Sequence, residues 1–237
     1  MSRRLRVGAS RPVGALLAVA LGLSAVSGCG TRLTPGVAAT INETTISQDR
    51  VDSVVQAACE YTAANAAAGG QAGAPVSLAN LRSTITQALI QFAVTDEAAT
   101  AMGLSVSEAA ISAGAEQNTI PESLDDDADH TLKGFFEEFA RSSAQGQLIG
   151  AHLSDPSITT FDEVTADKSA QASSYLKTFV AKQDITVNPA YGRWTGSAVV
   201  GGSGSLSDPV SDIAKASQAA ASDPQASTSD LPASQVC

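Results

Sequence analysis

The sequence has 237 residues, of which 24 are acidic and 14 are basic. Four of the basic residues lie before residue 28, so the remainder of the chain carries a net charge of −14. A surface this acidic repels phosphate backbones and anionic lipid headgroups, which excludes nucleic acid as a partner. Aromatic residues make up only 4% of the chain, so we expect a modest core built on small and aliphatic side chains.

The N-terminus is typical of an export signal. Four arginines precede an apolar run over residues 13–26, which is too short for a comfortable membrane anchor. The run ends in Val26-Ser27-Gly28-Cys29, which resembles the lipobox of bacterial lipoproteins. We therefore predict that residues 1–28 are a lipoprotein signal peptide and that Cys29 carries the lipid. The alternative is an ordinary secretory signal followed by an incidental cysteine.

Lipidation would place the protein on the outer face of the cell membrane. Two or three acyl chains suffice for stable anchoring, whereas one chain binds only marginally. Residues 29–36 are then a short tether between the membrane and the first folded element.

A short strand and a helix are expected at the start of the folded part. Residues 37–41 predict a brief strand that ends at the turn-forming pair Asn42-Glu43. Ser47 is a favoured N-cap residue for the first helix. An apolar stripe then recurs at helical spacing, formed by Val51, Val54, Val55 and Ala58.

Four further helices and a closing strand are expected downstream. Ser77 and Ser107 are suited to begin helices, and Gly103 is suited to end one. They predict helices over residues 77–102 and 107–117. A fourth helix follows the acidic segment 124–129, and a fifth spans about 166–182. Residues 184–189 predict a second strand, which is the natural partner of the first because a lone strand leaves its backbone groups unpaired.

Three stretches resemble one known family: residues 37–47, 101–108 and 185–194. In this order and spacing they are similar to the N-terminal chaperone domain of SurA/PrsA-type extracytoplasmic foldases. The resemblance extends to actinobacterial lipoproteins that carry only this domain, whose C-terminus is similar to residues 231–237. It implies a mainly α fold over residues 37–195, with orthogonal helices and a small two-stranded sheet that pairs the two ends. Residues 196–237 are Gly-, Ser- and Ala-rich, and we expect a mostly poorly ordered tail.

The resemblance implies a chaperone without catalysis. Full-length foldases carry a parvulin-type isomerase domain, and no segment of this chain has its pattern of strands, glycine-rich turns and histidines. The implied partners are unfolded or exported polypeptides, held by apolar contacts. The candidate client-binding residues are the largest apolar side chains of two helices: Phe92, Phe135, Phe136 and Phe139. The alternative function is that of an accessory lipoprotein that docks one specific partner in the cell envelope.

No cofactor or metal site is expected. The aspartates at 125–129 lack the spacing of a calcium loop and fit an acidic helix N-terminus, which the helix dipole favours. His130 and His152 are the only histidines, and on one helix they would be about 33 Å apart, too far to share a metal or a proton.

Besides Cys29, the chain has two cysteines, Cys59 and Cys237. In an exported protein disulfides persist, and two cysteines permit a single pairing. We predict a Cys59–Cys237 disulfide, with two free thiols as the alternative.

Overall fold

The computed structural model describes residues 35–69, 75–201, 208–223, 228–229 and 231–237. The predicted signal peptide and Cys29 lie outside these residues. The described residues belong to one compact unit. Within the described part of the chain, no helix combines the length and the apolar character needed to cross a membrane.

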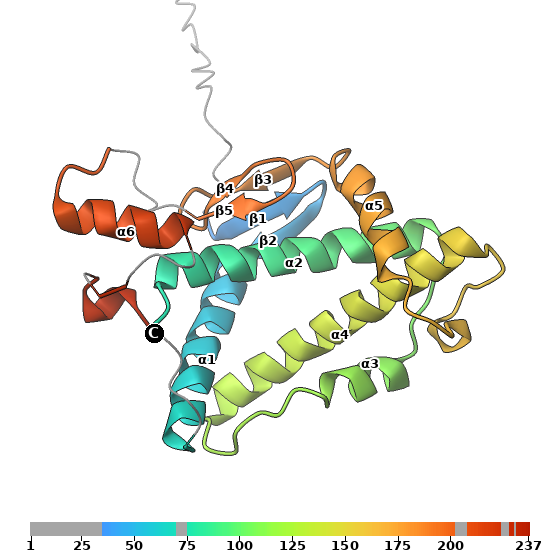
Figure 1. The fold of residues 1–237 in the computed structure, drawn as a ribbon, viewed down its shortest axis with the longest axis horizontal. Coiled ribbons are helices and arrows are strands. Elements are labelled where there is room, and N and C mark those ends of the chain that lie inside the picture. Colours follow the sequence, from blue (N-terminus) through green and yellow to red (C-terminus); the bar gives the residue numbers. More distant parts are fainter. Residues whose placement is uncertain (1–34, 70–74, 202–207, 224–227, 230) are drawn as a thin grey trace, which may run out of the picture. The chain divides into compact units, whose positions relative to one another are not determined.

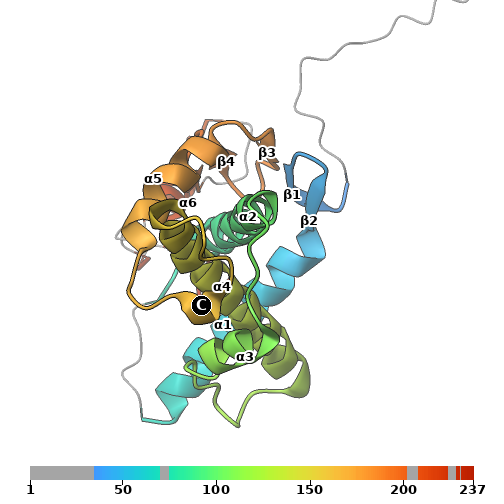
Figure 2. The same ribbon diagram turned by 90° about the vertical axis from the view of Figure 1, so that its right-hand side faces the viewer.

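A three-stranded antiparallel sheet joins the two ends of the domain. Strand β1 (Val37–Ile41) lies between β2 (Thr44–Ser47) and β3 (Ile185–Val187), in the order β2-β1-β3 (Figure 2). Ala39 pairs with Val187 and Ile41 with Ile185, so the predicted strands pair as expected. The sheet has one strand more than predicted, because the chain turns back at Asn42 and pairs Thr44–Ser47 with β1.

Asn42 holds this turn in place. Its φ of +51° is a left-handed conformation that asparagine tolerates better than most residues. The side-chain carboxamide donates to Glu97 at 3.0 Å and to Gln183 at 2.6 Å. It also accepts from the Asp184 N–H at 3.0 Å. The turn therefore bonds to a helix residue, Glu97, and to the segment just before the last strand of the sheet.

Helices α1 (Gln48–Ala67) and α2 (Leu78–Ala101) pack beneath the sheet (Figure 1). The hydroxyl of Ser47 accepts from the Arg50 N–H at 3.1 Å, which confirms the predicted cap of α1. Gly103 follows the end of α2 with a φ of +68°, the left-handed stop expected there. The central core lies between the sheet and these helices, and its fully buried members include Ala38, Ile41, Val51, Val54 and Ile90.

Helix α4 (Asp126–Ser154) is the longest helix of the described residues. It contacts every other α-helix that lies between β2 and β3 in the chain, and we call this group of helices the central body. The first turns of α4 pack on α1, and α3 (Glu108–Ala115) lies along its middle. Its last turns bury Leu148 and Ile149 against α2 and α5 (Ser169–Val180). Between α4 and α5 lies a 3₁₀ turn, Phe161–Glu163.

The segment after residue 195 is built into the domain wherever the structure describes it. Strands β4 (Arg193–Trp194) and β5 (Val199–Val200) form a hairpin across the predicted boundary. Helix α6 (Asp212–Ser222) packs on α2 and buries Ala220 and Ala221. The expectation of a poorly ordered tail is corrected for these residues: the alanine side chains of α6, although small, pack closely on α2. A last 3₁₀ turn spans Ala233–Gln235.

The C-terminus is fastened between α1 and α2. The structure pairs Cys59 with Cys237 as a disulfide, with Cα atoms 5.3 Å apart, inside the usual range for such bonds. The Cys237 N–H also donates to the Val76 carbonyl at 2.9 Å, and Val236 bridges to Ser77. The disulfide and the backbone hydrogen bond therefore both hold Cys237 in place.

Tyr191 connects the chain after β3 to α1. Its side chain is buried in the central core, and its hydroxyl donates to Asp52 at 2.9 Å. Burial, together with the hydrogen bond and the negative charge of Asp52, raises the pKa of Tyr191 to about 12. Its burial and its bond to Asp52 make Tyr191 part of a packed corner of the core.

The raised pKa predicts an alkaline loss of stability. An unfolded tyrosine titrates near pH 10. The neutral phenol therefore contributes its full stabilisation below about pH 10, and this is lost as the pH rises towards 12. The free energy of unfolding of Tyr191→Phe, measured with urea, should be lower than that of wild type at pH 7. The difference between the two proteins should shrink between pH 10 and 12, and a constant difference would contradict the assignment.

The disulfide gives a second prediction. In the chain-entropy model, closing a loop this long stabilises the fold by up to about 5 kcal/mol. Cys59→Ser and Cys237→Ser should each lower the free energy of unfolding, and the double variant should be no worse than either single one. Intact mass before and after reduction should differ by two hydrogens. Two thiols that alkylate without reductant would refute the bond.

Candidate functional site

Three of the four candidate phenylalanines form one cluster between α2 and α4. The ring of Phe92 lies 5.5 Å from that of Phe135 and 6.3 Å from that of Phe139, measured between centroids. Phe135 and Phe139 are four residues apart and therefore share one face of α4. Aromatic rings at these distances attract one another through tilted and edge-to-face contacts.

The ring of Phe136 also lies 6.1 Å from that of Phe135 between centroids, but it lines a different surface from the other three. It packs with Leu132 of α4, Tyr61 of α1 and the loop before α4. Three phenylalanines within five residues exceed one helix face, and the structure divides them between two. The four candidate residues therefore lie on two surfaces, with Phe92, Phe135 and Phe139 on one and Phe136 on the other.

The phenylalanine cluster opens onto a groove of about 690 Å³ between α2, α4 and α5. Phe139 is 49% exposed, which is unusual for so large an apolar side chain, while Phe92 and Phe135 are half-buried below it. We call this surface the phenylalanine groove. Its apolar lining consists of Ile85, Ala88, Phe92, Phe135, Phe139, Ala172 and Leu176.

Helix α5 forms the outer wall of the phenylalanine groove because it approaches α4 closely at Gly150. A Cβ atom at this position would overlap the carbonyl of Lys168, immediately before α5. Ala172, buried in the contact between α4 and α5, continues the close packing. Small residues on both helices thus set the width of the groove.

The charge in the phenylalanine groove is negative. Among the described residues that line it, Asp167 is the only ionisable one. The Ser169 N–H donates to the Asp167 carboxylate at 2.8 Å, and this bond holds the pKa of the carboxyl below its usual range. The carboxylate stays ionised near neutral pH, so a cationic flank on a bound chain would be favoured over an anionic one.

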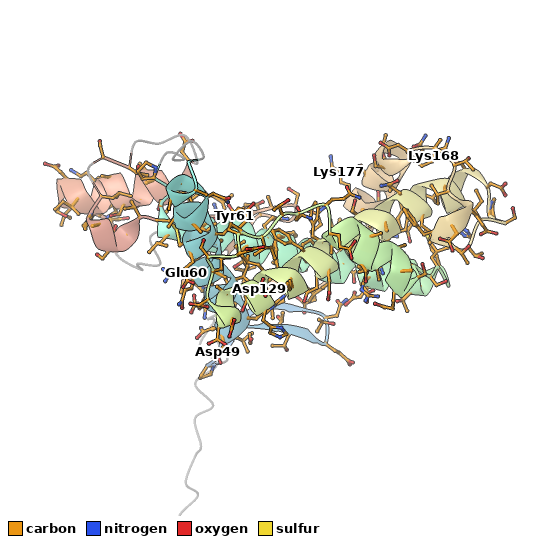
Figure 3. All side chains as sticks on the ribbon, turned by 90° about the horizontal axis from the view of Figure 1, so that it is seen from below. Asp49, Glu60, Tyr61, Asp129, Lys168 and Lys177 are labelled. Atoms are coloured by element: carbon orange, nitrogen blue, oxygen red, sulfur yellow. A yellow bond between two sulfur atoms is a disulfide. The ribbon has the colours of Figure 1, made fainter. Side chains whose placement is uncertain are left out.

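The acidic start of α4 acts as a helix cap. The Asp125 carboxylate accepts from the Ala128 N–H at 2.7 Å, and Asp129 pairs with Lys133 at 2.6 Å. Figure 3 places Asp129 near Glu60 of α1, at the other end of the body from Lys168 and Lys177. Among the described residues, no group of three acidic, histidine or cysteine side chains could hold a metal ion.

The two histidines lie near opposite ends of α4, as predicted. His152 Nδ1 is 2.8 Å from the carbonyl oxygen of Ile158, a contact that secures the turn after the helix. Neither histidine lines the phenylalanine groove.

Sequence reasoning missed two features, one in the phenylalanine groove and one beside it on α4. The first is the α5 wall, which depends on how a helix packs rather than on any motif. The second is Gln145, a buried side chain on α4 whose amide nitrogen donates to Asp96 at 2.7 Å. Its position three and four residues before the buried pair Leu148 and Ile149 is the signal that could have identified it.

Comparison with known proteins gives one finding. Residues 8–120 match the model of the SurA-like N-terminal domain. No curated protein and no solved structure matches significantly. The match includes two of the three stretches that carried the predicted resemblance, and the third is β3 with the corner that follows it.

The matched range contains the sheet hairpin, α1, α2 and α3, and the SurA-like N-terminal domain is the non-catalytic chaperone part of its family. The resemblance of this chain to the SurA-type N-terminal chaperone domain is therefore confirmed.

Proposed function

We propose that this protein is a membrane-anchored, extracytoplasmic lipoprotein that holds unfolded segments of exported proteins without catalysis. The observation that carries the proposal is the half-exposed Phe139 above the phenylalanine groove, in a chain with a SurA-like domain. Holding by apolar contact is non-directional and scales with the area covered, so it needs no catalytic residue.

The lining of the groove suits a client without a fixed sequence. Between its apolar residues lie small polar side chains, including Ser142, Ser143 and Ser173. These can hydrogen-bond a passing backbone, while the rings and Leu176 cover apolar side chains. Docking of one specific envelope partner remains the alternative, and the breadth of clients decides between the two.

The Phe139→Ser variant tests the groove. Covering a half-exposed phenylalanine contributes roughly 1 kcal/mol, so its loss should weaken client protection about fivefold. The melting temperature should stay nearly unchanged, because the ring is half in solvent. The measurement is suppression of aggregation of several unrelated unfolded proteins, titrated with the chain from Thr31.

Two controls sharpen this test. Leu153 is 44% exposed on the same helix but does not line the phenylalanine groove, so Leu153→Ser should protect clients like wild type. Phe135→Ser removes a ring packed on the central core and should lower stability by about 2 kcal/mol or more. Protection of a single protein only, or equal losses for Phe139→Ser and Leu153→Ser, would favour the accessory-lipoprotein alternative.

The membrane anchor gives a separate prediction. Cys29→Ser removes the thiol that would receive the lipid, so the full-length variant should accumulate as an unprocessed precursor or be released. Detergent phase partitioning of cells expressing wild type and variant is the measurement. A variant of mature size that still enters the detergent phase would refute lipidation at Cys29.

A further inference from the structure

A second groove, of about 610 Å³, is lined by residues of β2, α2 and α4. In Figure 2, β2 and α5 lie on opposite sides of α2. All four residues of β2 line the groove, together with Leu89, Phe92 and Ala93 of α2. We call it the β2 groove. Phe92 and Ser142 line both grooves, so the two are neighbours across the contact between α2 and α4.

The β2 strand offers unpaired backbone groups to this groove. Among the strands that the structure describes, β2 is at the edge of the sheet. The Asn188 N–H donates to the Ala38 carbonyl, and the Asn42 N–H donates to Asp184, so the even-numbered residues of β1 bond towards β3. The odd-numbered residues bond towards β2 and face Thr44 and Ile46. Thr45, which lies between these two and is exposed, therefore directs its own N–H and carbonyl to the free edge.

The opposite wall of the β2 groove holds a buried acceptor without a donor. Gln145 is 8% exposed, and its amide nitrogen donates a hydrogen bond to Asp96. Its Oε1 atom is buried and has no hydrogen-bond partner. A buried carbonyl oxygen left unpaired is unfavourable, so an N–H donor entering the groove would be stabilised there.

Three of the four charged residues that line the β2 groove are in ion pairs. Arg50 contacts Glu138 at 2.9 Å, and Arg141 contacts Glu108 at 3.0 Å. Asp96 is exposed and accepts a hydrogen bond from the neutral amide of Gln145, so among the described residues of the lining it is the one charged side chain outside an ion pair. Its floor, formed by Leu89, Phe92 and Ala93, is apolar. The complementary occupant is an uncharged, extended peptide with apolar side chains on one face.

We infer that the β2 groove binds an extended segment of an unfolded client as an added strand beside β2. One backbone unit of the client pairs with Thr45, and another N–H reaches Gln145. Because strand side chains alternate, every second residue would rest on Leu89 and Phe92. The inference rests on the proposed function and deepens it: the preferred clients are uncharged, strand-forming segments.

The test uses the chain from Thr31 and an end-blocked octapeptide of alternating Val and Gln. Thr45→Pro removes the outward N–H without removing a bond to β1, a substitution that edge strands tolerate. Thr45→Val keeps the N–H and is the matched control. A second probe, the same peptide with alternate amides N-methylated, removes the client's donors and needs no protein variant.

We expect Thr45→Pro to bind the octapeptide about five- to tenfold more weakly than wild type, which corresponds to one or two hydrogen bonds. Thr45→Val should bind like wild type, and the N-methylated peptide should bind wild type as weakly as the unmodified peptide binds Thr45→Pro. Equal affinity of wild type for both peptides overturns the added-strand inference. If aggregation suppression persists in that case, the proposed function stands without it. If wild type protects no client and binds neither peptide, both fail.

Discussion

The pairing of β1 with β3 is the contact on which the rest of the domain depends. It brings residues 37–41 beside residues 185–187, so every helix of the central body lies in a loop closed by one short ladder. Closing so long a loop costs conformational entropy. The cost is offset because Ala38, Ala39 and Ile41 are buried and because Asn42 and Asn188 extend the bonding at either end. The disulfide between Cys59 of α1 and Cys237 closes a second loop that overlaps the first.

In the domain that this ladder closes, the packing of α4 determines which large apolar side chains remain exposed to solvent. A helix of 29 residues that packs on α1, α2, α3 and α5 in succession cannot bury one face uniformly along its length. At its start the partner is α1, and at its end the partners are α2 and α5. Between these contacts no helix covers Phe139. The exposed ring is therefore a consequence of helix geometry, in a domain otherwise poor in aromatic residues.

Local chemistry predicted the elements well. Serine caps and the left-handed Gly103 place helix ends through bonds that involve neighbouring residues, and such signals are readable from sequence. The strand at 44–47 was missed because it has four residues and a single buried side chain, Ile46, too short a pattern to indicate a strand. The packing of α6 was also missed, since alanine-rich segments carry little periodic signal and gain stability only against a partner surface.

The candidate site was predictable in part, for the same reason. The four phenylalanines could be named from size and spacing, but their division between two surfaces required the positions of α1 and α5. The groove wall depends on Gly150 meeting the backbone of Lys168, a contact between residues that no local pattern joins. Gln145 and the free edge of β2 become informative only once the partners of each polar group are known.

The two grooves suggest how a holding chaperone can bind broadly and still release. The phenylalanine groove would contribute apolar contact that tolerates almost any sequence, whereas the β2 groove would contribute a few directional bonds to a backbone that all clients share. Each groove alone would contribute only a small part of the binding free energy of a client. Because Phe92 lines both grooves, one client segment long enough to reach from one to the other would bind the second site intramolecularly, which raises the overall affinity. A client that folds withdraws its backbone and its apolar side chains together, so both contributions are lost at once and release needs no energy source.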